Sequence, residues 1–175
     1  NSTRYEVSVK LDGSSITNYG VLKTDIDGDT SFEIGVCSRN LDLKLDQEGN
    51  TFIDMSKKNG LLEVINLMQE EIAIQGEMIA PKIQGNRENV PYPQFHVFKI
   101  FDIKTQEYLL PQERISKFNQ IQHFAKTHGI QLELYHVPIL HTSVTLNDLG
   151  IATMDELLQF AEGQSLNHKL REGVV

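Results

Sequence analysis

The chain has 175 residues, of which 39% are hydrophobic, and this is enough apolar material for a globular domain with its own core. Its single cysteine, Cys37, excludes an internal disulfide and favours a reducing, cytoplasmic compartment, and no apolar run approaches the roughly 20 residues that span a membrane. The net charge of -8 excludes a broad basic surface for phosphates, so any such surface is local or belongs to another domain.

The amino-terminal part of the chain predicts a strand followed by a hairpin. Residues 5–10 alternate in character, as a half-buried strand does, and the stretch 15–23 continues as a second strand. The acidic segment 25–29 then forms a turn into a strand over 31–37. Its aspartates lack the spacing and the closing glutamate of a calcium-binding loop, so a plain turn is the better interpretation.

The middle of the chain predicts two helices and two central strands. Apolar side chains between residues 61 and 68 form one helical face, and Asn59 is a good N-cap for that helix. The stretches 72–80 and 95–103 are rich in β-forming residues and mostly apolar, as central strands are. A second helix is expected over about 112–127 because its apolar residues recur on one side.

The carboxyl-terminal part predicts a strand, a helix and the start of another strand. Gly129 ends the preceding helix, and residues 131–137 read as a strand. The segment Thr153-Met154-Asp155-Glu156 is a capping box, which opens a last helix that Gly163 closes. The final residues, 170–175, read as a strand just beginning.

These elements together predict an α+β fold class. Long strands that read as antiparallel are interspersed irregularly with helices, and there is no repeat or low-complexity segment. We expect one domain over residues 1–175, cut from a longer protein at both ends, because the sequence lacks an initial Met and stops where a strand begins.

Lys10 is the first candidate for chemistry. It stands with Leu11, Asp12 and Gly13 where the first strand meets a turn, so its amine can project into a cleft while the glycine lets the backbone approach a ligand closely. A lysine amine attacks phosphorus only in its neutral form. Taken alone, however, a lysine beside an aspartate in a turn is more often a solvated pair.

Four further blocks follow Lys10 in order. They are Ser38-Arg39-Asn40, the run from Gly76 to Pro81 with Gln84-Gly85-Asn86 beyond it, Phe95 to Ile103, and Glu172 to Val175. With the Lys10 block they resemble motifs I, Ia, III, IIIa and IV of the covalent nucleotidyltransferase superfamily of DNA ligases, RNA ligases and mRNA capping enzymes. Each block alone could be a core phenylalanine or exposed charges, and the ordered set is what favours the family.

The resemblance implies a nucleotidyltransferase domain with an ATP-grasp-like fold of antiparallel sheets and flanking helices. It also implies that Lys10 is the catalytic nucleophile, which attacks the α-phosphorus of ATP and forms a lysyl-AMP intermediate. Asp12 and Glu172 are then expected near Mg²⁺ or Mn²⁺, held through water, and Gly13 is expected against the nucleotide.

Three more side chains are implied as nucleotide contacts. Arg39 is expected at a phosphate or at the ribose, Glu77 at the ribose hydroxyls, and Phe98 stacked on the adenine. The family pattern also includes motif V, a Lys-x-Lys pair that contacts the ATP phosphates after motif IV. This sequence stops at Val175, before that pair.

Two features favour an RNA ligase. Ser15 occupies the position two places after Asp-Gly where DNA ligases and capping enzymes usually carry an arginine, and the 76–86 run resembles motif III of nick-sealing RNA ligases. We expect a monomeric enzyme of RNA repair that joins 3′-hydroxyl to 5′-phosphate ends of nicked or broken RNA, with an OB-fold module supplying RNA contacts. The alternatives are a DNA ligase core and a non-catalytic module that binds nucleotides or RNA ends.

The histidines and the cysteine do not predict a metal or redox site. His123 and His128 are five residues apart, as are His136 and His141, whereas two ligands on one helical face stand about four apart. Cys37 has no helix N-terminus or charged partner in the sequence, so we interpret it as a strand residue rather than a nucleophile.

Overall fold

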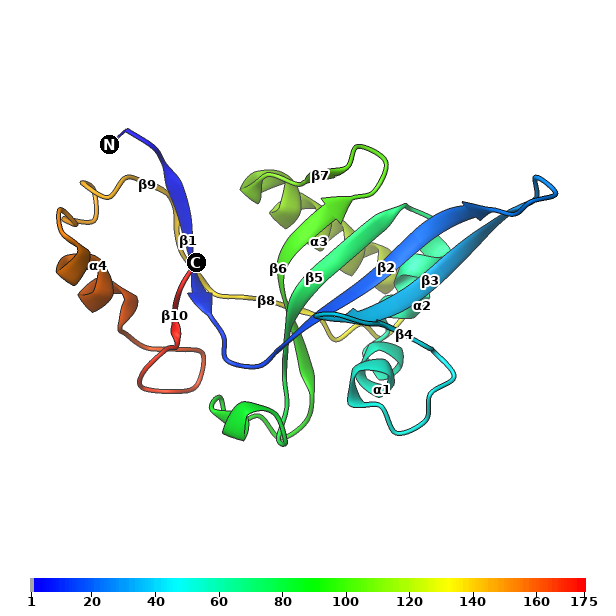
Figure 1. The fold of residues 1–175 in the computed structure, drawn as a ribbon, viewed down its shortest axis with the longest axis horizontal. Coiled ribbons are helices and arrows are strands. Elements are labelled where there is room, and N and C mark those ends of the chain that lie inside the picture. The colour runs from blue at the N-terminus through cyan, green and yellow to red at the C-terminus, as the bar shows by residue number, and fades with distance from the viewer. Residues whose placement is uncertain (1) are drawn as a thin grey trace. The chain divides into compact units, whose positions relative to one another are not determined.

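The computed structural model describes residues 2–175 of the chain (Figure 1). These residues form two compact units, each assembled from segments that are separate in the sequence. The three-stranded unit comprises Asn1–Gly13, Ile79–Tyr92 and Val137–Val175, and the seven-stranded unit comprises Ser14–Met78 and Pro93–His136. None of the described helices is long and apolar enough to cross a membrane.

The sheet of the three-stranded unit has β1 (Tyr5–Lys10) at its centre. It pairs antiparallel with β9 (Ile139–Val144) on one side and with β10 (Gly173–Val174) on the other. Val7 and Val9 alternate with more exposed neighbours and are only 8% and 3% exposed, which confirms the half-buried strand predicted over 5–10. The strand expected at the end of the chain is also present, as β10.

The predicted capping box opens α4 (Met154–Ala161). The Thr153 hydroxyl accepts from the Glu156 backbone N–H at 3.3 Å, and the Glu156 carboxylate accepts from the Thr153 N–H at 2.9 Å. At the other end, the Arg171 guanidinium donates to the carbonyl oxygens of Ala161 and Glu162, at 2.8 and 3.1 Å. A cation there also suits the helix dipole, so charged and polar groups close both ends of this helix.

The seven-stranded sheet has the order β4-β3-β2-β5-β6-β7, with β8 pairing with β6. The β6–β8 pair is parallel, whereas β2–β3, β2–β5, β3–β4 and β6–β7 are antiparallel. The predicted central position of β5 and β6 and the α+β class are confirmed. The strands are β2 (Ser14–Thr24), β3 (Thr30–Ser38), β4 (Asp42–Leu43), β5 (Ile72–Ile79), β6 (Gln94–Asp102), β7 (Glu107–Tyr108) and β8 (Tyr135–His136).

Three helices belong to this unit, namely α1 (Thr51–Lys58), α2 (Leu61–Met68) and α3 (Pro111–Thr127). Helix α2 packs against β2 and β3, which form a long hairpin in Figure 1. A Cβ added to Gly20 would lie 2.6 Å from the Ile65 side chain, so the helix approaches the strand as closely as glycine allows. This contact buries one face of the sheet.

Several parts of the fold differ from the sequence prediction, which also lacked the short strands β4 and β7. Helix α1 was not predicted, and Asn59 is its C-cap rather than the N-cap of the next helix. Gly60 stands between the two helices with φ of 83°, although the Asn59 side chain still accepts from the Leu61 N–H at 2.9 Å. Strand β9 was also not predicted.

The strand predicted over 131–137 is wrong in extent, because only β8 forms there. The backbone N–H of Glu133 donates to the Asn59 carbonyl at 2.8 Å, and the carbonyl of Gln131 lies against Gly60. The backbone around Gln131 and Glu133 therefore lies against the junction between α1 and α2, and only Tyr135 and His136 pair with a neighbouring strand, β6.

Candidate active site

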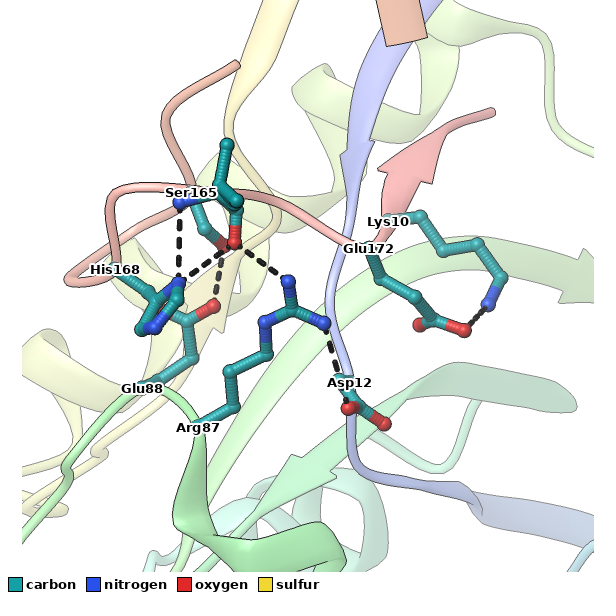
Figure 2. Close-up of polar contacts among 8 residues, drawn as sticks. Lys10, Asp12, Arg87, Glu88, Ser165, His168 and Glu172 are labelled. Atoms are coloured by element: carbon teal, nitrogen blue, oxygen red, sulfur yellow. Dashed lines mark hydrogen bonds and ion pairs between the residues drawn. The ribbon is translucent and has the colours of Figure 1, made fainter. Parts of the chain in front are cut away.

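Lys10 is the last residue of β1 and forms an ion pair with Glu172 (Figure 2). The Lys10 amine donates a hydrogen bond to the Glu172 carboxylate, and the two side chains are 48% and 34% exposed. Register explains the contact, because Lys10 pairs with Gly173 across β1 and β10. The first and last predicted blocks are thus adjacent in the fold.

Asp12 lies just beyond β1 and faces Arg87. The Asp12 carboxylate is 3.9 Å from Nη1 of Arg87, and the two side chains are 28% and 29% exposed. Figure 2 shows the same guanidinium reaching the segment before Glu172, where Nη2 donates to the Leu170 carbonyl at 2.9 Å. Gly13 follows in the bend that leads out of this unit.

The segment that carries Arg87 is held by its own polar side chains. It begins with the short helix η1 (Gln84–Asn86). The side-chain amide of Asn86, the last residue of this helix, donates to the Val90 carbonyl at 3.0 Å and accepts from the Val90 N–H at 2.9 Å. Glu88 is only 1% exposed, and its carboxylate accepts from the Ser165 hydroxyl and from the Asn167 N–H, the latter at 2.7 Å.

Sequence reasoning missed both Arg87 and Glu88. They directly follow the Gln84-Gly85-Asn86 run, so their position was the only available signal. Their partners are distant in the chain, and no local pattern in the sequence indicates those contacts.

In the seven-stranded unit, Glu77 lies on a half-exposed polar face of the sheet. It stands directly opposite Ser15 in the β2–β5 pair, and Gln75 stands opposite Thr17. Their neighbours Ile74 and Met78 are fully buried on the opposite face. Glu77 is therefore accessible from the side of the sheet that carries the polar residues.

Phe98 and Arg39 also belong to this unit. Phe98 is partly exposed in β6, whereas Phe95 and Val97 beside it are fully buried, so Phe98 differs from a core phenylalanine. Arg39 is exposed in the bend that follows β3. The predicted site residues thus divide between the units, with Lys10, Asp12, Gly13 and Glu172 in one and Arg39, Glu77 and Phe98 in the other.

Two partly buried side chains of the sheet, Tyr19 and Cys37, contact the Asp42 carboxylate. The Tyr19 hydroxyl donates to it at 3.1 Å, and the Cys37 thiol lies 3.5 Å from the same oxygen. Burial, reinforced by this carboxylate, raises the pKa of Tyr19 to about 12 and the pKa of Cys37 to about 11. Cys37 is thus a protonated thiol in β3, as the sequence predicted for a strand residue.

His96 is a buried histidine, 2% exposed. Its ring stacks on Tyr135 with centroids 4.9 Å apart, and Nε2 lies 3.0 Å from the Gln94 side-chain oxygen. Burial, together with the nearby His136, lowers the pKa of His96 to about 4. Among residues 2–175, no group of three or more His, Cys, Asp or Glu side chains could hold a metal ion.

The solved structures that resemble this chain include RNA ligases of Naegleria gruberi. An apo mutant is 35% identical, and the match covers 99% of this chain and 46% of that one with a TM-score of 0.79. A mutant with ATP and Mn has the same identity and TM-score and covers 99% and 45%. A mutant with AMP and Mn is 35% identical, covers 98% and 45%, and has a TM-score of 0.78.

The chain therefore spans about half the length of these ligases. A search of curated proteins found no match. A family model described as RNA ligase matches residues 3–175, which is nearly all of the sequence. The chain belongs to the RNA ligase family.

Proposed function

We propose that this chain is the adenylylation core of an ATP-dependent RNA ligase, and that its two units together form one nucleotidyltransferase domain over residues 1–175. The observation that carries the proposal is the Lys10–Glu172 pair, which joins the predicted nucleophile to the predicted carboxylate of motif IV. The family match, together with the Naegleria gruberi ligases solved with ATP or AMP, supports ATP as the nucleotide substrate.

The proposed reaction begins at the Lys10 amine. An ammonium paired with a carboxylate has no free lone pair, so Lys10 must leave Glu172 and lose a proton to water before it attacks. Its nitrogen then bonds to the α-phosphorus of ATP, the bond from that phosphorus to the bridging oxygen breaks, and pyrophosphate leaves. The AMP passes to the 5′-phosphate of RNA, which frees the amine, and attack by a 3′-hydroxyl on that phosphate releases AMP and seals the strand.

Asp12 and Glu172 fit a hard divalent cation held through water. Both carboxylates lie in the same unit and are 28% and 34% exposed, so hydrated ions can reach them, and oxygen ligands suit Mg²⁺ or Mn²⁺. Such an ion supplies positive charge against the triphosphate when it is bound. Without the ion, Lys10 forms an ion pair with Glu172, and Arg87 forms one with Asp12.

Three side chains of the seven-stranded unit are proposed to recognise the nucleotide. Arg39 is exposed and can pair with a phosphate or meet the ribose, and Glu77 is on the polar face, where it can accept from ribose hydroxyls. Phe98 keeps part of its ring free for stacking on adenine. Gly13 is proposed to bring the backbone close to the nucleotide.

The proposed substrate is nicked or broken RNA. Ser15 stands where DNA ligases and capping enzymes have arginine, and the chain's net charge of -8 leaves RNA affinity to an OB-fold module of the same protein. We propose a monomer that acts in RNA repair. The lone Cys37 supports the reducing cytoplasm as its compartment.

Covalent capture of AMP tests the nucleophile. The natural full-length protein is incubated with α-labelled ATP and Mg²⁺ or Mn²⁺ and then denatured. Label should stay on the protein and be released by acid, as from a phosphoramidate, and Lys10→Ala should carry none. A Lys10→Ala protein labelled at the wild-type level contradicts the assignment.

Parallel sealing of two nicks tests the substrate. A nick whose 3′-hydroxyl belongs to RNA should be sealed faster than an all-DNA nick, because a site arranged around the 2′-hydroxyl leaves polar groups unpaired on DNA, at about 1–3 kcal/mol. Pre-adenylylated 5′ ends separate this step from ATP capture. If both nicks are sealed at the same rate, the enzyme is assigned to the DNA ligases. If AMP binds but neither nick is sealed, the chain is a non-catalytic binding module.

A further inference from the structure

Arg87 joins the two segments that carry the proposed nucleophile and its carboxylate partner. One end of its guanidinium faces Asp12, two residues after Lys10, and the other binds the Leu170 carbonyl, two residues before Glu172. Figure 2 draws the Arg87–Asp12 contact and the Lys10–Glu172 pair in one view. A planar guanidinium suits this role because its donors point in fixed directions.

The strand pairing between those segments is short. Strands β1 and β10 have only two register pairs, Val9 with Val174 and Lys10 with Gly173, and backbone bonds between Ser8 and Val175 extend them. A pairing of this length is weak by itself. Because Arg87 contacts both segments, it adds a constraint on their relative position that the strand pairing does not provide.

Arg87 itself is held in place from the next residue. Glu88 is 1% exposed and fixes the segment at Ser165 and Asn167, while Asn86 closes the loop on Val90. The Arg87 side chain is 29% exposed, so most of its surface is enclosed by the protein. This anchoring makes the position of the guanidinium a property of the fold.

We propose that Arg87 is a positioning residue for lysine adenylylation, which fixes Asp12 and the 170–172 segment relative to Lys10. The inference rests on the proposed function and adds a residue to it. Loss of Arg87 should slow the formation of the nitrogen–phosphorus bond while leaving ATP binding nearly unchanged, because Arg87 acts on the protein groups around Lys10. A misplacement of about 1 Å in such a site lowers rates by up to about 100-fold.

The test measures single-turnover lysyl-AMP formation by the full-length protein over a range of α-labelled ATP concentrations, with saturating Mn²⁺. Arg87→Ala should lower the rate at saturating ATP by about 10- to 100-fold, and the ATP concentration for half-maximal rate should change less than about threefold. Arg87→Lys should restore part of the rate, since an ammonium can face Asp12 but cannot bind Leu170 at the same time.

Arg4→Ala is the matched control. It removes the same kind of side chain from the same unit, where Arg4 binds Ser143 at 2.7 Å and lies 4.0 Å from Asp148, and it should keep the wild-type rate. The double variant with Asp12→Asn should lose less than the product of the two single effects, because both act through one contact.

A wild-type rate for Arg87→Ala per folded molecule overturns the proposal, and so does a loss confined to ATP affinity or a double variant with fully multiplied effects. If Arg87→Ala does not fold, Arg87→Lys decides, and a wild-type rate there overturns it. A wild-type protein that takes no label contradicts the proposed function itself, and the inference falls with it.

Discussion

The two units of this chain differ in the balance between apolar burial and charged contacts, although Val9 and Leu11 are buried in the three-stranded unit too. The seven-stranded unit is built on apolar burial, with Ile16, Ile74 and Phe95 fully buried between sheet and helices. In the three-stranded unit, charged side chains hold irregular segments together, as Arg87 and Arg171 do. Burial of apolar surface is the larger stabilising term in folding, so the first unit should supply most of the chain's stability.

This difference between the units predicts that the residues that stabilise the fold are mostly not the residues that carry out the reaction. The charged groups that order the three-stranded unit include those proposed to meet the triphosphate and the metal ion, such as Lys10 and Glu172. Substitutions there should change reaction rates more than folding. Substitutions in the core of the other unit should do the reverse.

The largest expected effect on stability is at Phe95. Phe95→Ala should lower the free energy of unfolding by about 3–5 kcal/mol, because the ring is fully buried and packs where Gly76 has no side chain. Lys10→Ala should change it by less than about 1 kcal/mol, since its ion pair is exposed to solvent. Urea unfolding of both variants measures their free energies of unfolding. An equal loss of stability in Lys10→Ala and Phe95→Ala would contradict the comparison.

The next effect is a pH dependence from the buried His96. Its pKa is about 4 in the folded chain and 6.5 in the unfolded chain, so between these values the unfolded chain binds a proton that the folded chain does not. Stability should therefore fall as pH drops from 7 to 4, by about 2–3 kcal/mol from this residue. His96→Phe keeps an aromatic ring beside Tyr135 and should lose that share of the slope. If urea unfolding gives the same dependence of stability on pH for the wild type and His96→Phe, a group other than His96 is responsible for it.

Phe98 sharpens the comparison because it belongs to the stable unit and is proposed to act on the nucleotide. Phe98→Ala should weaken ATP use by about 1–3 kcal/mol, the usual contribution of a base stacked on an aromatic ring. Phe98→Leu should recover part of this loss. The ATP dependence of lysyl-AMP formation measures both, and an unfolded Phe98→Ala whose folded fraction uses ATP normally would make Phe98 a core residue.

The smallest expected effect is at the start of α4. Thr153→Ala should destabilise the three-stranded unit by about 1 kcal/mol, because the Glu156 N–H loses the hydroxyl that caps it. Thr153→Ser retains an oxygen and serves as the control. Hydrogen exchange of the α4 amides should accelerate only in Thr153→Ala, and unchanged exchange would mean that other contacts hold this helix.

Local signals in the sequence were enough for the regular parts of the fold. Strand β1, the β2–β3 hairpin and the capping box at Thr153 follow from alternation, turn residues and cap spacing within a few positions. Helix α1 carries a local signal that the sequence prediction overlooked, because the Asn50 side chain caps it by accepting from the Phe52 N–H. The shortened β8 depends instead on contacts between distant segments. For example, the backbone N–H of Glu133 donates to the carbonyl of Asn59, so it is not available for pairing with a strand.

The same division applies to the candidate site. The ordered blocks indicated Lys10 and Glu172, and the fold brings those two together. Arg87 and Glu88 have no local signature, because each is defined by partners that only folding brings near. Contacts of this kind depend on three-dimensional geometry rather than on the spacing of residues along the chain.

The Lys10–Glu172 contact also has a consequence for biosynthesis. The two residues are separated by 162 positions, so the lysine emerges from the ribosome long before its partner exists. At typical elongation rates of about 5–20 residues per second, the delay is roughly 8 to 32 seconds. During that interval no nascent chain can make the pair, however well its earlier segments have folded. The proposed nucleophile gains its carboxylate neighbour only among the last of the described residues to be synthesised.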